Sequence, residues 1–108
     1  MKLKLTFQQL QALHLMVAML LDTYDSPRKM AEKLVYEIVC NIEVKTGSKV
    51  HAIERGSTTT SSVKLTTLEA KAFYIWYLAL IALVPADSYQ YERIVCDRII
   101  NEIDKVFS

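Results

Sequence analysis

The chain has 108 residues, 52% of them hydrophobic, and its 13 basic and 12 acidic side chains give a formal net charge of +1. This length corresponds to one small domain, and the near-neutral charge argues against a nucleic-acid-binding protein, which usually carries a concentrated basic face. Glycine and proline occur only twice each, so the apolar sequence is expected to form long, uninterrupted helices.

A first helix is predicted over residues 6–22. Apolar side chains recur there at spacings of three and four, from Phe7 to Leu20, which is the pattern of an amphipathic helix. Thr6 followed three residues later by Gln9 is a capping-box sequence. The helix is therefore expected to begin at Thr6.

A second helix is predicted after the sequence DTYDSP. Ser26 is a suitable N-cap, and Pro27 suits the first helical position because its missing N–H has no intrahelical partner there. Gly47 is interpreted as the C-cap, followed by a short turn or strand. The apolar spacing between residues 42 and 53 also fits a helix that continues to Gly56, which is the alternative.

Two more helices are predicted in the second half of the chain. The polar sequence GSTTTSS before them is typical of a loop. The third helix is expected to begin at Thr66, which has a capping partner in Glu69, and to end before Pro85. The fourth is expected to follow Asp87 as its N-cap, because a stripe of apolar residues then runs to the end of the chain.

The two halves of the sequence resemble each other at an offset of 60 residues. The sequence KLT occurs at residues 4–6 and again at 64–66, and nine identities fall between residues 4–45 and 64–105 without a gap. Both capping boxes fall in register. We interpret this as duplication of a helical hairpin, with chance similarity between amphipathic helix pairs as the alternative.

The predicted fold class is therefore all-α, a four-helix bundle built from two duplicated antiparallel αα-hairpins. One domain is expected to span residues 1–108. Hairpin one would cover about 4–46, a linker 47–63, and hairpin two about 64–107.

Residues that could support catalysis or bind a metal are scarce. His14 and His51 are the only histidines, and neither stands in a metal-binding motif. Cys40 and Cys96 have apolar neighbours, so both are expected to be buried and unpaired in a reducing cytoplasm. We predict no catalytic residue, no cofactor and no metal.

The most apolar segment is KAFYIWYLALIALVP at residues 71–85. Its uncharged part, residues 72–84, would be about 20 Å long as a helix, against about 30 Å for the hydrocarbon core of a bilayer, so no membrane span is expected. Its aromatic side chains surround the helix, and one bundle core is not expected to cover them all. The candidate interface residues are Tyr74, Trp76, Tyr77 and Leu83.

These observations predict a small non-enzymatic assembly or interaction module that forms a homodimer in the cytoplasm. An unidentified protein is the other partner considered, and no nucleic acid is expected. The alternative function is a small-molecule-binding or enzymatic helical bundle with a pocket between the hairpins. A membrane-surface protein that uses the third helix is a further alternative.

Overall fold

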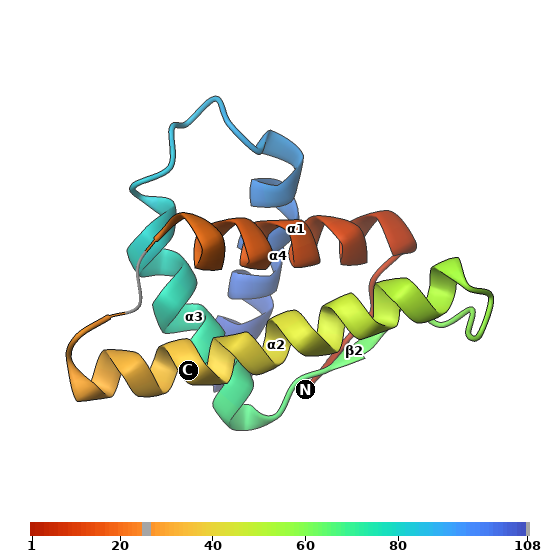
Figure 1. The fold of residues 1–108 in the computed structure, drawn as a ribbon, viewed down its shortest axis with the longest axis horizontal. Helices are drawn as coiled ribbons and strands as arrows, with labels where there is room; N and C mark the ends of the chain where they lie inside the picture. Colours follow the sequence, from red (N-terminus) through yellow and green to blue (C-terminus); the bar gives the residue numbers. More distant parts are fainter. Residues whose placement is uncertain (25–26, 108) are drawn as a thin grey trace.

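The computed structural model describes residues 1–24 and 27–107 (Figure 1). Its helices are α1 (Phe7–Thr23), α2 (Met30–Glu54), α3 (Thr67–Ile81) and α4 (Gln90–Phe107). A short antiparallel sheet pairs β1 (Lys2–Leu3) with β2 (Val63–Lys64). The predicted all-α class, with four helices that pack against each other, is confirmed.

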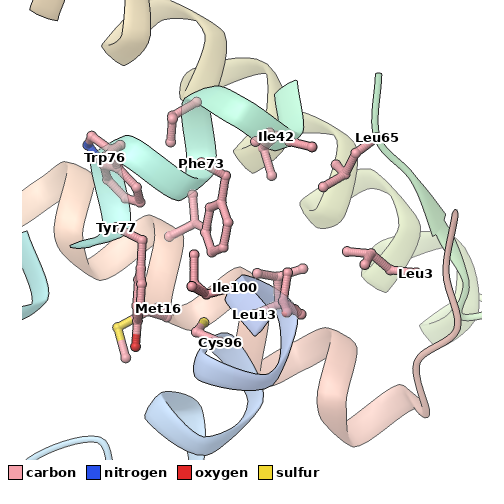
Figure 2. Close-up of a cluster of buried hydrophobic side chains, with 14 of the residues drawn as sticks. Leu3, Leu13, Met16, Ile42, Leu65, Phe73, Trp76, Tyr77, Cys96 and Ile100 are labelled. Atoms are coloured by element: carbon pink, nitrogen blue, oxygen red, sulfur yellow. The ribbon is translucent and has the colours of Figure 1, made fainter. Parts of the chain in front are cut away.

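The four helices share one hydrophobic core. α1 packs against both α2 and α4, and α2 packs against α3, whereas α3 and α4 make only sparse contact. In Figure 1, α1 and α2 lie side by side and α4 crosses behind α1. Figure 2 shows Phe73 and Tyr77 pointing from α3 towards Cys96 and Ile100 of α4, with Trp76 at the edge of the cluster.

Both predicted capping boxes are present and set the first residues of α1 and α3. The Thr6 hydroxyl accepts a hydrogen bond from the amide of Gln9 at 3.2 Å, and the Gln9 side chain accepts one from the amide of Thr6 at 2.9 Å. Thr66 and Glu69 repeat this arrangement at 3.1 and 2.8 Å. Each box satisfies two amides that the helix itself leaves without partners.

The offset of 60 residues recurs in the structure. α1 and α3 begin 60 residues apart, as do α2 and α4, and residues 10–17 are buried position by position like residues 70–77. In the sheet, Leu3 pairs with Val63, the residue 60 positions later. These relations agree with a pseudo-twofold axis near that pair, and the duplication itself stays a prediction.

α2 does not end at Gly47, so the predicted break there is wrong. The helix continues to Glu54, within the segment interpreted as a linker, and the chain turns at Gly56, whose φ is +76°. The reason is packing, because Val50 and Ile53 extend the buried stripe of α2 by two more turns against the core. The alternative that we considered, a helix that continues to Gly56, is the one observed.

Gly47 has a different role, which is to let α1 approach α2. A Cβ atom at this position would lie 2.9 Å from Cε1 of His14 on α1. The His14 imidazole also contacts the neighbouring Thr46, with 2.9 Å between Nδ1 and Oγ1. Because the Thr46 hydroxyl donates to the carbonyl of Ile42, its oxygen accepts from His14.

The predicted start of α2 is also corrected. The helix begins at Met30, with Lys29 as an N-cap that makes no side-chain capping bond, so Pro27 does not occupy the first helical position. Ser26, the predicted N-cap, lies outside the described residues.

α4 begins at Gln90, and Asp87 does not cap it. The preceding residue, Tyr89, has a φ of +55°, and its carbonyl accepts the amide of Arg93 at 2.9 Å. The Arg93 guanidinium fixes this turn by donating hydrogen bonds to three loop carbonyls, those of Val84, Pro85 and Ser88. The turn before α4 is therefore held by a side chain from the first turn of that helix.

Substitution of Gly47 tests the contact between α1 and α2. In the wild-type background we expect Gly47→Ala to lower the free energy of unfolding by about 1 kcal/mol, because His14 must move and lose its bond to Thr46. In a His14→Ala background we expect it to raise the free energy by about 0.5–1 kcal/mol, since alanine favours a helix over glycine. Urea unfolding of the four proteins measures both values. Equal effects in the two backgrounds would contradict the contact.

The thiols give a second test. Cys40 and Cys96 are both unpaired, but only Cys96 is buried and Cys40 is half-buried, which corrects the expectation for Cys40. Burial raises the pKa of each thiol, and nearby carboxylates add to the effect.

We expect a bulky thiol reagent to label Cys40 slowly in the native protein and Cys96 only through opening of the fold. Mass spectrometry of a time course measures the labelling rate of each cysteine, with the urea-unfolded protein as the control. Equal labelling rates for Cys40 and Cys96 in the native protein would refute the packing around Cys96.

Candidate functional site

The apolar run at residues 71–85 forms most of α3 and the turn that follows it. Across the part of the chain that the structure describes, no helix combines the length and the apolar character needed to cross a membrane. One side of α3 packs into the core, and its other side is exposed. The exposed side is the candidate functional surface.

The structure places the four predicted interface residues differently. Tyr77 is fully buried and Trp76 is 7% exposed, Tyr74 is half-buried, and Leu83 is 62% exposed. Tyr77 is held inside because its ring stacks on Phe73, with 5.5 Å between centroids, and its hydroxyl donates to Asp97 at 3.0 Å. Two of the four residues therefore belong to the core of the single chain, and the exposed surface of α3 is made mainly by other residues.

The exposed side of α3 carries a continuous row that we call the outer stripe. Its members are spaced alternately three and four residues apart, and all are exposed. This spacing is that of the seam by which one helix packs along another in a coiled coil. The outer stripe consists of Leu68, Lys71, Ile75, Leu78 and Ala82. Sequence reasoning missed Leu68, Ile75 and Leu78, although their spacing could have revealed them.

The corresponding face of α1 provides an internal comparison. Most of the residues that lie 60 positions before the outer stripe are polar. The two exceptions are Ala18 and Leu15, whose side chain is 47% exposed. Residues 10–17 and 70–77 have matching burial patterns, and α1 carries polar residues at three of these five positions. The corresponding residues of α1 are Gln8, Gln11, Leu15, Ala18 and Asp22. The apolar character of the outer stripe is therefore not a requirement of the fold.

An apolar groove of about 500 Å³ lies beside the outer stripe. α2 and α3 are joined at one end, where the Lys45 ammonium lies 2.7 Å from the Glu69 carboxylate, and the groove opens between them towards the N-terminus of α2. Its walls come from α1, α2 and α3, and Trp76 is among the residues that line it. The lining residues are Leu20, Tyr24, Pro27, Ala31, Glu32, Val35, Tyr36, Ile75, Trp76, Ala79 and Leu80.

Ile75 forms a ridge between this groove and a smaller hollow. The hollow, of about 250 Å³, lies between α3 and α4 and is lined by Ile75, Tyr74, Phe107 and their neighbours. At its edge the Lys71 ammonium lies 5.5 Å from the centre of the Phe107 ring, a cation–π contact. Ile75 itself is 58% exposed. The surface of α3 is thus a ridge with a depression on each side.

Groups suited to catalysis or to metal binding do not converge in the described residues. No cluster of three or more histidine, cysteine or acidic side chains there is placed to hold a metal. His14 is bonded to Thr46, and His51 is exposed, 4.0 Å from Glu54. A third depression contains Lys45, Lys49 and Lys64, but Lys45 is already bonded to Glu69.

Comparison of the chain with models of known protein families, with curated proteins and with solved structures finds no match. Function is therefore argued from the geometry of this surface. The outer stripe and the adjoining groove are its most distinctive features, because they are apolar and exposed together.

The bond between Lys45 and Glu69 predicts a pH dependence of stability. Burial acts to raise the pKa of Glu69, but hydrogen bonds from Lys45 and Thr66 and the Lys45 charge outweigh it and lower the pKa from 4.5. Because the pKa of Glu69 is lower in the folded protein than in the unfolded chain, the ionised carboxylate stabilises the fold at pH values above the unfolded pKa. This stabilisation is lost as the pH falls through the folded pKa.

We therefore expect Glu69→Gln, which keeps a capping oxygen, to lower the free energy of unfolding at pH 7 by about 1 kcal/mol, because Lys45 is partly exposed. The difference from wild type should disappear as the pH is lowered below 4.5. Urea unfolding across this range measures it, with Glu102→Gln on the exposed face of α4 as control. A difference that stays constant with pH would contradict the ion pair.

Proposed function

We propose that this protein is a small non-enzymatic module that forms a homodimer through the outer stripe of α3. The observation that carries the proposal is the contrast between the two equivalent faces. Gln8 stands on α1 where α3 has Leu68, and Ala18 stands where α3 has Leu78. Large exposed side chains that the fold does not need are typical of an interaction surface.

The area that a stable dimer needs bears on which surface takes part. Stable interfaces bury about 1,200–2,000 Å² over both partners. One helix alone offers little of that area, so the groove beside the outer stripe has to be part of the interface.

The small residues of α3 support close pairing of helices. Ala79 and Ala82 are exposed next to Ile75 and Leu78, and small side chains let a second helix approach while larger neighbours fill the space between the axes. The two unpaired thiols fit a reducing compartment, so we place the homodimer in the cytoplasm.

A second candidate function rests on the groove. Its volume of about 500 Å³ lies within the range of small-molecule sites, about 300–1,000 Å³, and its walls are largely apolar. The groove lies between the two hairpins, as the alternative function requires. Native mass spectrometry of the purified protein distinguishes the two candidates, because it reports oligomer mass and retained small molecules together.

The proposed interface is tested by a matched pair of substitutions. Ile75 and Leu15 occupy equivalent positions on α3 and α1, and both are exposed. We expect Ile75→Gln to raise the dissociation constant of the dimer at least about thirtyfold, which corresponds to about 2 kcal/mol, because each copy loses an apolar contact. Leu15→Gln should leave it unchanged.

Sedimentation equilibrium over a range of concentrations measures both constants, and far-UV circular dichroism checks that each variant keeps its helices. A wild-type protein that stays monomeric at all concentrations would refute the proposal. Equal weakening by the two variants would place the interface elsewhere.

A further inference from the structure

We infer that the third depression, which lies between α2 and β2, binds a small phosphorylated molecule of the class of the sugar phosphates. The depression has a volume of about 510 Å³. Among the described residues, none lines both this depression and the groove beside the outer stripe, so the inference does not rest on the proposed homodimer. The lining residues are Lys45, Ser48, Lys49, Ala52, Thr58, Ser62, Val63, Lys64 and Thr66.

The two walls of the depression follow from the periods of a helix and a strand. Figure 1 shows β2 running beside the second half of α2. On α2, Lys45, Ser48 and Lys49 are spaced three and four residues apart and share one face of the helix. On the returning chain, Val63 and Leu65 are buried in the core, so the residues that alternate with them face the other way. These alternating residues, which line the depression, are Ser62, Lys64 and Thr66.

The depression concentrates positive charge. Its lining includes three lysines and, among the described residues, no acidic side chain. Lys45 is paired with Glu69, whereas Lys49 and Lys64 are in no ion pair with any described residue. Clefts lined by charges of one sign raise the local concentration of ligands of the opposite sign. The two unpaired lysines therefore favour an anionic ligand.

Lys45 is held in position as a hydrogen-bond donor. Its ammonium donates to the Glu69 carboxylate at 2.7 Å and to the Lys64 carbonyl at 2.8 Å. A lysine ammonium has three N–H donors, so these two bonds leave one N–H for a ligand. Because the bonds already restrict the side chain, a ligand that binds the remaining N–H loses less conformational entropy in ordering it.

The charge of the depression matches a phosphate monoester. Such a group carries about −1.5 to −2 charges at pH 7 and presents three strong acceptor oxygens. The unpaired Lys49 and Lys64 supply two positive charges, and Lys45 supplies a further donor. Ammonium groups form strong, charge-assisted hydrogen bonds with phosphate oxygens. A carboxylate would satisfy only part of this arrangement.

The rest of the depression indicates the body that carries the phosphate. Its volume is within the range of small-molecule sites, about 300–1,000 Å³, and is larger than a phosphate group alone fills. None of the described lining residues is aromatic, so a nucleobase would find no ring on which to stack. A sugar can instead exchange hydrogen bonds with the lining hydroxyls. These belong to Ser48, Thr58, Ser62 and Thr66.

Binding of phosphorylated and unphosphorylated sugars tests the inference. Isothermal titration calorimetry at constant ionic strength compares glucose 6-phosphate and ribose 5-phosphate with glucose, ribose and inorganic phosphate. We expect at least one sugar phosphate to bind more tightly than inorganic phosphate, and the unphosphorylated sugars not to bind measurably. Absence of binding by both sugar phosphates, or equally tight binding of inorganic phosphate, would overturn the inference. Vesicles that contain a phosphoinositide test a lipid headgroup as the source of the phosphate, and binding to these vesicles alone would overturn a free sugar phosphate.

Lysine substitutions locate the site. We expect Lys49→Gln and Lys64→Gln each to raise the dissociation constant of the sugar phosphate at least about tenfold, since each removes a charge-assisted hydrogen bond. Lys4→Gln should leave it unchanged, because Lys4 stands 60 residues before Lys64 and is exposed outside the depression. Circular dichroism confirms that each variant is folded. Equal weakening by all three changes, or weakening by none, would overturn the assignment of the site.

Discussion

The carboxylate of Glu69 connects the start of α3 with α2, two parts of the chain that are distant in sequence. It accepts hydrogen bonds from the Thr66 amide at the start of α3 and from the Lys45 ammonium on α2. Lys45 also donates to the carbonyl of Lys64 in β2, at 2.8 Å. This bonding holds the start of α3 against α2. The groove lies further along α3, beside its C-terminal half.

The two sides of α3 differ in chemistry as well as in burial. The inner side carries Phe73 and Tyr77, whose rings stack and whose single hydroxyl is satisfied by Asp97. The outer side carries the aliphatic Leu68, Ile75 and Leu78. Each large aromatic side chain buries a large apolar area in the core, and the aliphatic side chains at seam spacing remain exposed, as in a helix that packs along another.

The two capping boxes follow from the sequence, whereas the starts of α2 and α4 and the contacts between distant residues do not. The first residues of α1 and α3 follow from capping partners three residues apart. The continuation of α2 through Gly47 depends on His14 and on the core beyond it, which no local pattern shows. The aromatic residues that surround α3 make Tyr77 a candidate for the interface from sequence alone, whereas its burial depends on Asp97 of α4. The spacing of the outer stripe is present in the sequence, within the same segment as the aromatic cluster.

The pairing of β1 with β2 has a consequence for the order of folding. Leu3 is fully buried and pairs with a strand that lies 60 residues later in the chain. Closing so long a loop costs chain entropy, and the sheet that forms has only two residues in each strand. Contacts between α1 and α2 need much shorter loops and are expected to form first. The sheet then joins the already folded helices late, so truncation of Leu3 should accelerate unfolding much more than it slows folding.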